Sequence, residues 1–369
     1  MTAGPLLLQG RSKFGMRLSD FDYHLPEDLI ALEPSAVRGE SRLLHVQKGG
    51  THHHQFTELP SLLKEGDLLV LNNTRVFPAA LTGTRPAREG GGEVRVDLNL
   101  LYPVEVRERQ VTWRAFARPA KRLKAGDHLQ IGSAAEAQVV RREGGEVDLL
   151  LNLSSDDFMA AVEEEGKIPL PPYIARRRDV TSSDRERYQT VYAVHSGSVA
   201  APTAGLHFTP TILSALERRG ITTAEVTLHV GPGTFLPVSS NDISDHQMHS
   251  EWGEITPDVA ASINAAKAEG RRIVSVGTTS TRLLEAAAVA DGVLEPFRAA
   301  TDIFITPGYK FRIVDALITN FHLPRSTLLM LISAFAGVNS VKDAYKSAVE
   351  ERYRFYSYGD ACLLEKDND

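Results

Sequence analysis

The sequence contains a single cysteine, Cys362, and this scarcity excludes several classes of protein. One cysteine cannot form an intrachain disulfide, a CxxC redox pair or a multi-cysteine zinc or iron–sulfur site. Because such sparse use of cysteine is typical of a reducing cytosol, we expect a cytoplasmic protein.

Long hydrophobic runs are lacking too. Near the amino terminus there is only the triplet Leu6, Leu7 and Leu8, which is too short for the core of a signal peptide. The most apolar stretch elsewhere, residues 328–336, falls far below the ~20 residues that a membrane helix needs. We therefore predict a protein that is neither exported nor membrane-spanning.

The chain has no large excess of charge and neither of two common nucleotide-binding motifs. Lys and Arg total 41 against 47 Asp and Glu, a net charge of −6, so a nucleic acid would have to bind a local basic patch. The patterns GxxxxGK[ST] and GxGxxG are absent. Their absence removes the main support for a phosphate-loop ATPase or a dinucleotide-dependent dehydrogenase.

What is present is an ordinary globular composition, with 42% hydrophobic and 24% charged residues over 369 residues, which suggests two domains. Residues 1–15 show no periodicity and precede a second methionine, Met16, so we expect a disordered extension there. Between residues 65 and 153, short β-type runs alternate with glycine-rich turns, and no helical stretch separates them. This spacing predicts a small antiparallel β-barrel domain.

After residue 169 the pattern changes to alternating strands and helices. β-type runs at 225–230, 272–276 and 312–318 alternate with helical patterns at 257–269, 281–290, 326–335 and 341–353. Such alternation predicts an α/β architecture with parallel strands. We expect residues 16–64 and 154–369 to form this larger domain together, with residues 65–153 inserted into it.

Three loops after predicted strands have the character of a ligand site, because ligands of α/β folds collect at the carboxyl ends of the strands. Their glycines expose backbone amides, and their hydroxyls can bind a nucleoside or an anion. The loops contain Gly231, Gly233 and Thr234; Thr278, Thr279 and Ser280; and residues 319–324. Each loop alone could equally be an ordinary turn and helix cap.

Histidines concentrate in one stretch of the chain, and side chains that titrate near neutral pH suit proton transfer. They are His195, His207, His229, His246 and His249, followed by Glu251. Since His246, His249 and Glu251 are of types that bind zinc or iron, a metal-dependent hydrolase is an alternative, although the spacing is not HExxH. Each histidine alone could instead be structural.

Basic residues cluster in the predicted barrel and once in the larger domain. Aromatic residues lie between them in the barrel, a composition that suits binding of a nucleic-acid backbone and stacking of its bases. We assign to nucleic-acid binding Arg114, Arg118, Lys121, Arg122 and Lys124 of the barrel, and Arg176 of the larger domain. The alternatives are a solvated charged face for each cluster and, for the whole protein, a non-catalytic RNA-binding module.

Several longer segments remain, and they run in one order from Met16 to about Leu364. They are NNTRV (72–76), PLPPYI (169–174), YQTVY (188–192), AAPTAGLHF (200–208), TLHVGPGTF (227–235), HQMHSE (246–251), VGTTS (276–280), TNFHLP (319–324) and YRFYSYGD (353–360). In these segments the chain resembles the S-adenosylmethionine:tRNA ribosyltransferase-isomerases.

The resemblance implies the penultimate stage of queuosine synthesis. The ribosyl part of S-adenosylmethionine would be transferred to 7-aminomethyl-7-deazaguanine at the tRNA wobble position and rearranged to an epoxycyclopentanediol, giving epoxyqueuosine with release of adenine and methionine. A β/α-barrel-like larger domain interrupted by a small β-barrel is implied as well, in agreement with the predicted insertion. The expected partners are the tRNA and S-adenosylmethionine as co-substrate, without a metal or separate cofactor, and we expect a monomer.

This chemistry needs at least one base, because the sulfonium acidifies the neighbouring C5′ hydrogens, and one acid that protonates the leaving adenine. We expect both among the acid–base side chains of the matching segments, without assigning either role to one residue. These side chains are His207, His229, His249, Glu251 and Asp360. The six named glycine and hydroxyl residues of the loops are expected to contact S-adenosylmethionine, and the six basic residues the tRNA.

The chain departs from the family pattern at three positions. Ala80 stands where the family usually has arginine, Arg95 where a glutamate is expected, and Cys362 where methionine is expected. We expect Arg95 to replace part of the charge lost at Ala80, and Cys362 to be a packing exchange.

Overall fold

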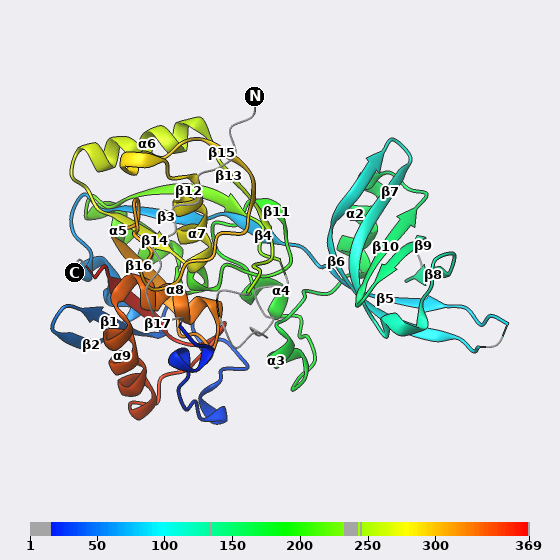
Figure 1. The fold of residues 1–369 in the computed structure, drawn as a ribbon, viewed down its shortest axis with the longest axis horizontal. Helices are drawn as coiled ribbons and strands as arrows, with labels where there is room; N and C mark the ends of the chain where they lie inside the picture. Colours follow the sequence, from blue (N-terminus) through cyan, green and yellow to red (C-terminus); the bar gives the residue numbers. More distant parts are fainter. Residues whose placement is uncertain (1–15, 90, 133–134, 232–242, 244–245, 368–369) are drawn as a thin grey trace.

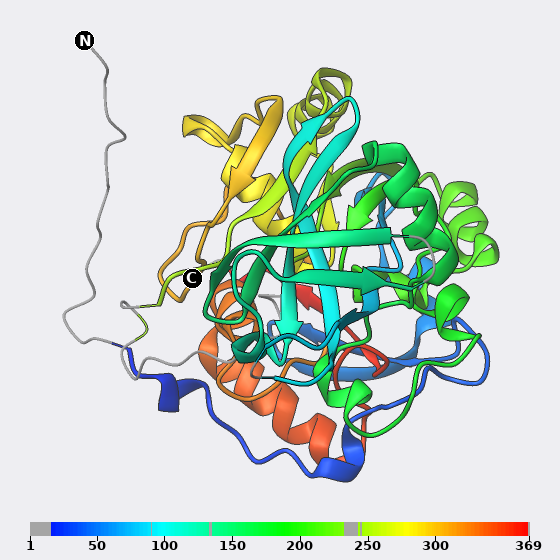
Figure 2. The same cartoon turned by 90° about the vertical axis from the view of Figure 1, so that its right-hand side faces the viewer.

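The computed structural model describes residues 16–89, 91–132, 135–231, 243 and 246–367, so the extension expected at residues 1–15 lies outside the described residues. Figure 1 shows a larger α/β domain with a smaller barrel beside it, and Figure 2 places the barrel in front of the larger domain. Within the described ranges, no helix has both the length and the hydropathy of a membrane span.

The larger domain is built around a mixed sheet of nine strands. In spatial order they are β15 (Phe297–Thr301), β13 (Glu251–Ile255), β12 (Thr222–Leu228), β3 (Leu68–Asn72), β14 (Ile273–Val276), β16 (Ala316–Asn320), β17 (Ala361–Glu365), β1 (Arg42–Gln47) and β2 (Gly50–Gln55). β12, β14 and β16 run parallel, as predicted, with β3 parallel between β12 and β14, and antiparallel pairs extend the sheet on both sides. Because β1 pairs with β17, the segment before the barrel belongs with the carboxy-terminal part.

Helices cover both faces of this sheet. On one face, the core includes residues of α6 (Pro257–Ala268), α7 (Thr278–Ala287), α8 (Thr327–Ala336) and α9 (Val338–Glu350); on the other, residues of α1 (Leu59–Leu62) and α5 (Pro210–Arg218). β3 shows why the sequence folds this way: all five of its residues are buried, the pattern of a strand covered on both sides. Leu68 and Val70 join the first core, and Leu69 and Leu71 join the second.

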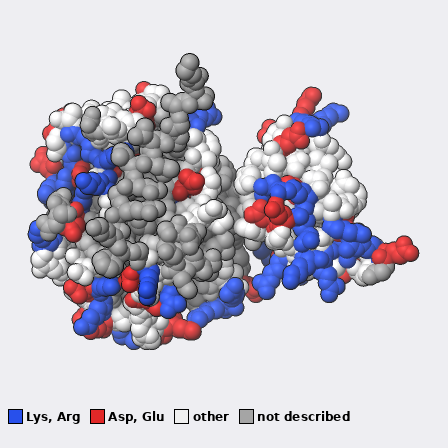
Figure 3. Space-filling view, in the orientation of Figure 1, with Lys and Arg blue, Asp and Glu red and all other residues white. Residues whose placement is uncertain are grey.

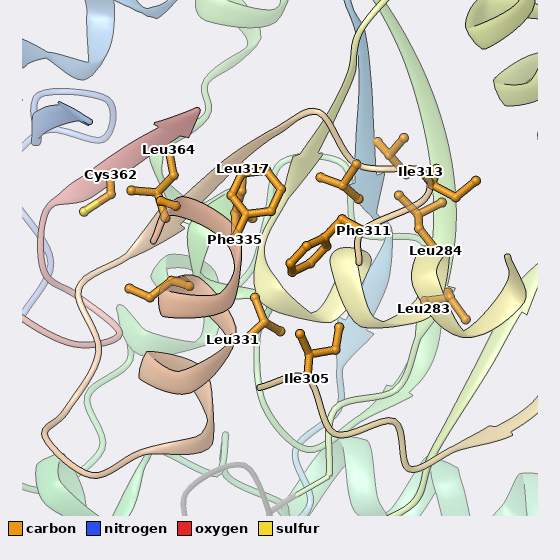
Figure 4. Packing of buried hydrophobic residues seen from close by; sticks show 14 of the residues in the cluster. Leu283, Leu284, Ile305, Phe311, Ile313, Leu317, Leu331, Phe335, Cys362 and Leu364 are labelled. Carbon is orange, nitrogen blue, oxygen red and sulfur yellow. The ribbon is translucent and has the colours of Figure 1, made fainter. Parts of the chain in front are cut away.

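Aromatic and aliphatic side chains fill the first core, part of which is shown in Figure 4. Phe311 and Phe335 pack edge to face there with ring centroids 4.9 Å apart. Cys362 is buried in the same cluster as Leu364, and burial raises the pKa of its thiol. An unionised thiol inside an apolar core fits the expected exchange for methionine.

The smaller domain is a closed barrel of six antiparallel strands, which confirms the predicted barrel. Around the barrel they are β10 (Glu146–Leu151), β7 (Gln110–Arg118), β6 (Val94–Arg107), β5 (Ala80–Arg85), β8 (His128–Ile131) and β9 (Ala135–Glu143). Inward and outward residues alternate, so Val96, Leu98 and Leu100 of β6 fill the interior. Helix α2 (Ser155–Glu165) adds Phe158 and Val162 to this core.

The predicted limits of the insertion, residues 65–153, are wrong at both ends. β3 pairs with β12 and β14 in the large sheet, because its continuous apolar run needs a position buried on both faces. The barrel strands begin only at β5, and α2 extends the barrel core beyond residue 153.

Two chain segments cross between the domains side by side. Ala80 and Lys167 exchange both backbone hydrogen bonds, at 3.0 and 2.9 Å. A Cβ on Gly166 would lie 2.0 Å from the carbonyl oxygen of Pro78, so this close crossing requires glycine. Near it, β4 (Thr74–Val76) and β11 (His195–Ser198) form a small parallel pair, and the short helices α3 (Pro172–Ala175) and α4 (Asp184–Arg187) follow the crossing.

Candidate active site

Four parallel strands end at one edge of the large sheet, and the residues after them form the candidate site. β12, β3, β14 and β16 are neighbours in that order, so their carboxyl ends meet. His229 follows β12, Thr74 follows β3, Thr278 and Thr279 begin α7 after β14, and Asn320 ends β16. The sheet thus brings together the described residues of the three loops predicted from the sequence, with residue 231 the last one described in the first loop.

The imidazole of His229 is held on several sides. Its Nδ1 lies 2.8 Å from the hydroxyl oxygen of Thr74, which is completely buried. The ring stacks on Trp252 with centroids 5.2 Å apart, and a Cβ on Gly197 would lie within 2.9 Å of three of its ring atoms. The Thr74 hydroxyl also lies 3.4 Å from the carbonyl oxygen of His195. When the hydroxyl donates its hydrogen to that carbonyl, its oxygen accepts a hydrogen bond from Nδ1–H of His229. In this tautomer Nε2 carries no hydrogen and can accept a proton.

The surroundings of His229 also favour its neutral form. Burial lowers the pKa of His229, and the nearby His195 lowers it further. A neutral imidazole with a free acceptor nitrogen is the form that takes up a proton. Among the five predicted acid–base residues, His229 therefore has the geometry of a base.

A cavity of about 850 Å³ lies between the two domains and is lined by His229. The barrel side of its wall is mostly apolar, with one charged side chain, Glu163 of α2; its apolar residues are Phe77, Leu101, Tyr102, Pro103, Trp113, Met159 and Ala160. The larger domain contributes Gly197, Gly231, Glu251 and Trp252 beside the histidine. Apolar walls with a few polar groups at one end are typical of small-molecule sites.

A second hollow, of about 80 Å³, shares one lining residue, Val230, with this cavity. Thr278, Thr279 and Asn320 are among its other lining residues. The first turn of α7 begins here, and its N-cap residue, Gly277, has no side chain that could cap the helix amides. The positive end of the helix therefore favours an anionic group in this hollow.

The other predicted loop residues differ in their positions. The hydroxyl of Ser280 is buried and donates to the carbonyl oxygen of Val276 at 2.9 Å, so it stabilises the helix and does not face the hollow. Gly231 lines the cavity. Gly233 and Thr234 lie outside the described residues.

His207 is buried, and both of its ring nitrogens are engaged in hydrogen bonds. Nε2 accepts from the side-chain amide of Asn320 at 3.1 Å, so Nδ1–H donates to the hydroxyl of Ser41 at 2.8 Å. Burial, followed by the charges of Arg354 and Arg38, lowers the pKa of His207 to about 4. Such a side chain holds Asn320 in place and has no free nitrogen for proton exchange.

Glu251 forms a buried ion pair with Arg282 of α7 and accepts the amide of Gly231 at 3.0 Å. His249 is exposed and His246 is half-buried. In the part of the chain that the structure describes, no three His, Cys, Asp or Glu side chains are grouped to hold a metal ion. The metal-dependent hydrolase therefore has no geometric support there, and Glu251 positions the loop that follows His229.

Asp360 is buried and acts on the backbone. Its carboxylate accepts the amides of Arg42 at 2.9 Å and Arg354 at 2.8 Å. It lines neither the cavity nor the hollow. These contacts give Asp360 a structural role in joining β1 to the loop before β17, in place of the predicted acid–base role.

Most of the predicted tRNA-binding residues are exposed. Arg114 is the exception, because two of its nitrogens bond Asp148 at 2.7 and 3.0 Å, and this pairing raises its pKa. The exposed residues are Arg118, Lys121, Arg122, Lys124 and Arg176. Figure 3 shows basic side chains gathered along the lower edge of the barrel and at the adjacent edge of the larger domain.

Arg95 does not replace the charge lost at Ala80. On the barrel surface Arg95 pairs with Thr84, whereas Ala80 pairs with Asn99. Positions 80 and 84 are about 13 Å apart along a strand, so the two departures from the family pattern act at different places.

The sequence did not single out Thr74, Gly197 or Trp252 as site residues. Thr74 belongs to the segment NNTRV, and Trp252 directly follows HQMHSE. Their position in or next to segments that match the family pattern could therefore have identified them. There was no such signal in the sequence for Gly197, because this glycine is brought to His229 only by the pairing of β11 with β4.

The fold and the site together define an α/β protein with an inserted β-barrel and a ligand cavity between the two domains. The family model described as queuosine biosynthesis protein matches residues 18–364. The chain belongs to this family, which confirms the resemblance found in the sequence.

Its relatives match over nearly their whole length. S-adenosylmethionine:tRNA ribosyltransferase-isomerases from Maricaulis maris and Phenylobacterium zucineum are 53% and 54% identical, over 95% of this chain and 99% of theirs. A crystal structure of an S-adenosylmethionine tRNA ribosyltransferase from Thermotoga maritima is 34% identical with a TM-score of 0.52, covering 94% of this chain and 99% of that one.

Proposed function

We propose that this protein is an S-adenosylmethionine:tRNA ribosyltransferase-isomerase. It transfers the ribosyl part of S-adenosylmethionine to 7-aminomethyl-7-deazaguanine at the tRNA wobble position and rearranges it to the epoxycyclopentanediol of epoxyqueuosine, while adenine and methionine leave. The names of the relatives support this activity. The structural observation that carries it is that two hollows of different chemistry are both lined by Val230, next to His229.

The two hollows differ in the chemistry that they favour. At the smaller one, the uncapped start of α7 with Thr278 and Thr279 suits the carboxylate and hydroxyls of S-adenosylmethionine. The aromatic wall of the larger cavity suits a nucleobase taken out of its stack. A ribosyl group passing from one to the other crosses the junction at Val230.

His229 is the base of this proposal. Its neutral imidazole, with Nδ1–H directed to Thr74, presents Nε2 to a hydrogen of C5′, which the adjacent sulfonium acidifies. Trp252 and Gly197 fix the plane of the ring. The exposed basic residues of the barrel bind the tRNA backbone and hold the nucleotide over the cavity.

The test is to incubate the purified protein with S-adenosylmethionine and tRNA that carries 7-aminomethyl-7-deazaguanine, and to follow free adenine and the mass of the modified nucleoside. A matched tRNA with guanine at the same position is the control. Adenine release with equal formation of epoxyqueuosine is expected only with the first tRNA. Binding of this tRNA without adenine release would instead support the RNA-binding module. A cytoplasmic location, a monomeric state and the lack of a separate cofactor stay predictions.

A further inference from the structure

Beside the smaller hollow, a pocket of about 20 Å³ is lined by two arginines, Arg38 and Arg187. Ser35 and Ser357 add polar groups to its wall, and Ser357 lines the smaller hollow as well. The pocket thus adjoins the candidate active site, although none of the proposed roles uses its arginines.

Within the described part of the chain, each guanidinium donates to two backbone carbonyls and to no side chain. Arg38 donates to the carbonyl oxygens of residues 189 and 186, at 2.8 and 3.0 Å. Arg187 donates in return to the carbonyl oxygens of residues 35 and 36, at 2.6 and 3.3 Å. Since a guanidinium has five N–H groups, both arginines keep donors for a ligand.

The charges of the two arginines are not balanced locally. Among the residues with described positions, neither has a carboxylate within the 4.0 Å of an ion pair, whereas the neighbouring Arg178 pairs with Asp184 at 2.7 Å. The charge of Glu186, an exposed side chain, acts to raise the pKa of Arg38, as Tyr358 does. Burial and then the like charge of Arg187 lower the pKa of Arg38, the effect expected of two cations facing one pocket.

An oxyanion between the two guanidinium groups would remove this repulsion and accept their remaining N–H groups. Arginine binds phosphate and carboxylate through two parallel hydrogen bonds, so paired arginines favour such a ligand strongly. We infer that Arg38 and Arg187 bind one phosphodiester of the tRNA backbone, next to the nucleotide that enters the cavity. This inference rests on the proposed function.

The position of the pocket favours RNA over the carboxylate of S-adenosylmethionine. Arg187 ends α4, and the same segment of chain carries Arg176 and Arg177, both exposed, just after α3. Where Figure 1 labels α3, the space-filling view of Figure 3, in the same orientation, shows basic side chains at the edge that adjoins the basic edge of the barrel. A tRNA backbone lying along both basic edges would pass the pocket. The carboxylate of S-adenosylmethionine, in contrast, already has a proposed binding site at the start of α7.

The test measures the Kd of tRNA at several salt concentrations for the wild type, Arg38→Gln and Arg187→Gln. Each variant should weaken tRNA binding about tenfold or more and flatten the slope of log Kd against log salt. The double variant Arg38→Gln/Arg187→Gln should flatten that slope by about 0.7–0.9, the value of one lost phosphate contact. Arg298→Gln, an exposed arginine that pairs with Glu254, is the control and should match the wild type. The affinity for S-adenosylmethionine should not change.

Because Arg187 also joins two loops, the thermal unfolding midpoint of the Arg187→Gln protein is measured as well. Arg187→Lys serves as a second variant. Lysine keeps the positive charge but cannot make the two parallel hydrogen bonds of a guanidinium. The salt dependence of tRNA binding should therefore return to the wild-type slope, while the tRNA affinity recovers only in part. A salt slope that stays at the wild-type value in both glutamine variants overturns the inference, and so does a loss of S-adenosylmethionine affinity with unchanged tRNA binding. If the wild type binds both substrates but releases no adenine, the proposed function fails while the binding test of the arginines stands.

Discussion

Gly197 offers the sharpest test of how the site is built, through the variant Gly197→Ala. The new Cβ would lie 2.7 Å from Nε2 of His229, while ordinary contact begins at 3.4 Å, so the ring must move by about 3.4 − 2.7 = 0.7 Å. Trp252 is stacked on the ring and restricts its retreat. A reacting group misplaced by about 1 Å can lose on the order of 10²-fold in rate, and the crowding should cost about 1–3 kcal/mol of stability.

The assay is the kcat and KM of adenine release, with the thermal unfolding midpoint measured beside them. Gly50→Ala is the matched control, because Gly50 also has a positive φ, 141° against 148° at Gly197, and no atom lies within 4 Å of the Cβ that it would add. Combining Gly197→Ala with His229→Ala should give no further loss of kcat, since both changes act on one imidazole. A normal kcat in folded Gly197→Ala, or a fully additive loss in the double variant, would refute this reasoning.

Three further predictions concern residues around the site. Thr74→Val should lower kcat about tenfold by removing the partner of His229 Nδ1, whereas Thr74→Ser should keep most activity; equal losses in a kinetic comparison would contradict the role of the hydroxyl. His207 binds a proton with a pKa of about 4 when folded against 6.5 in the unfolded chain, so the unfolded state takes up more protons as pH falls. Between pH 6.5 and 4, the free energy of unfolding of the wild type should therefore fall by about 3 kcal/mol more than that of His207→Gln. Denaturant titrations in which the free energy of unfolding changes equally with pH in the two proteins would count against this. Asp360→Asn should lower the free energy of unfolding by about 1–3 kcal/mol and leave kcat per folded molecule unchanged, so a large fall in kcat with normal unfolding would restore Asp360 as a catalytic candidate.

Local patterns in the sequence were enough to predict most strands and helices, but not their place in the fold. The turns and alternating residues of the barrel are local signals, and they predicted a separate β domain. β3 has an equally clear apolar run, yet which sheet it joins depends on β12 and β14, whose partners lie far along the chain. Position next to the barrel strands therefore led to its wrong assignment.

The candidate site shows the same limit for individual side chains. The sequence named His229 for its chemistry and its place after a strand, and the structure gives it an open cavity. His207 and Asp360 carry equally suitable groups, but their partners Asn320 and Arg42 are 113 and 318 residues away in the chain. Burial and partners of this kind come from tertiary packing, which separates structural from reactive side chains and leaves no local trace.

The most direct test of the central claim compares adenine release by the wild type and by His229→Ala, with both substrates present and both proteins shown to be folded. The wild type should release adenine in step with formation of epoxyqueuosine, and His229→Ala should do so at least about tenfold more slowly, the usual contribution of a positioned base. A variant that is folded and nearly as fast as the wild type would contradict the claim that His229 at the domain junction is the base of the reaction.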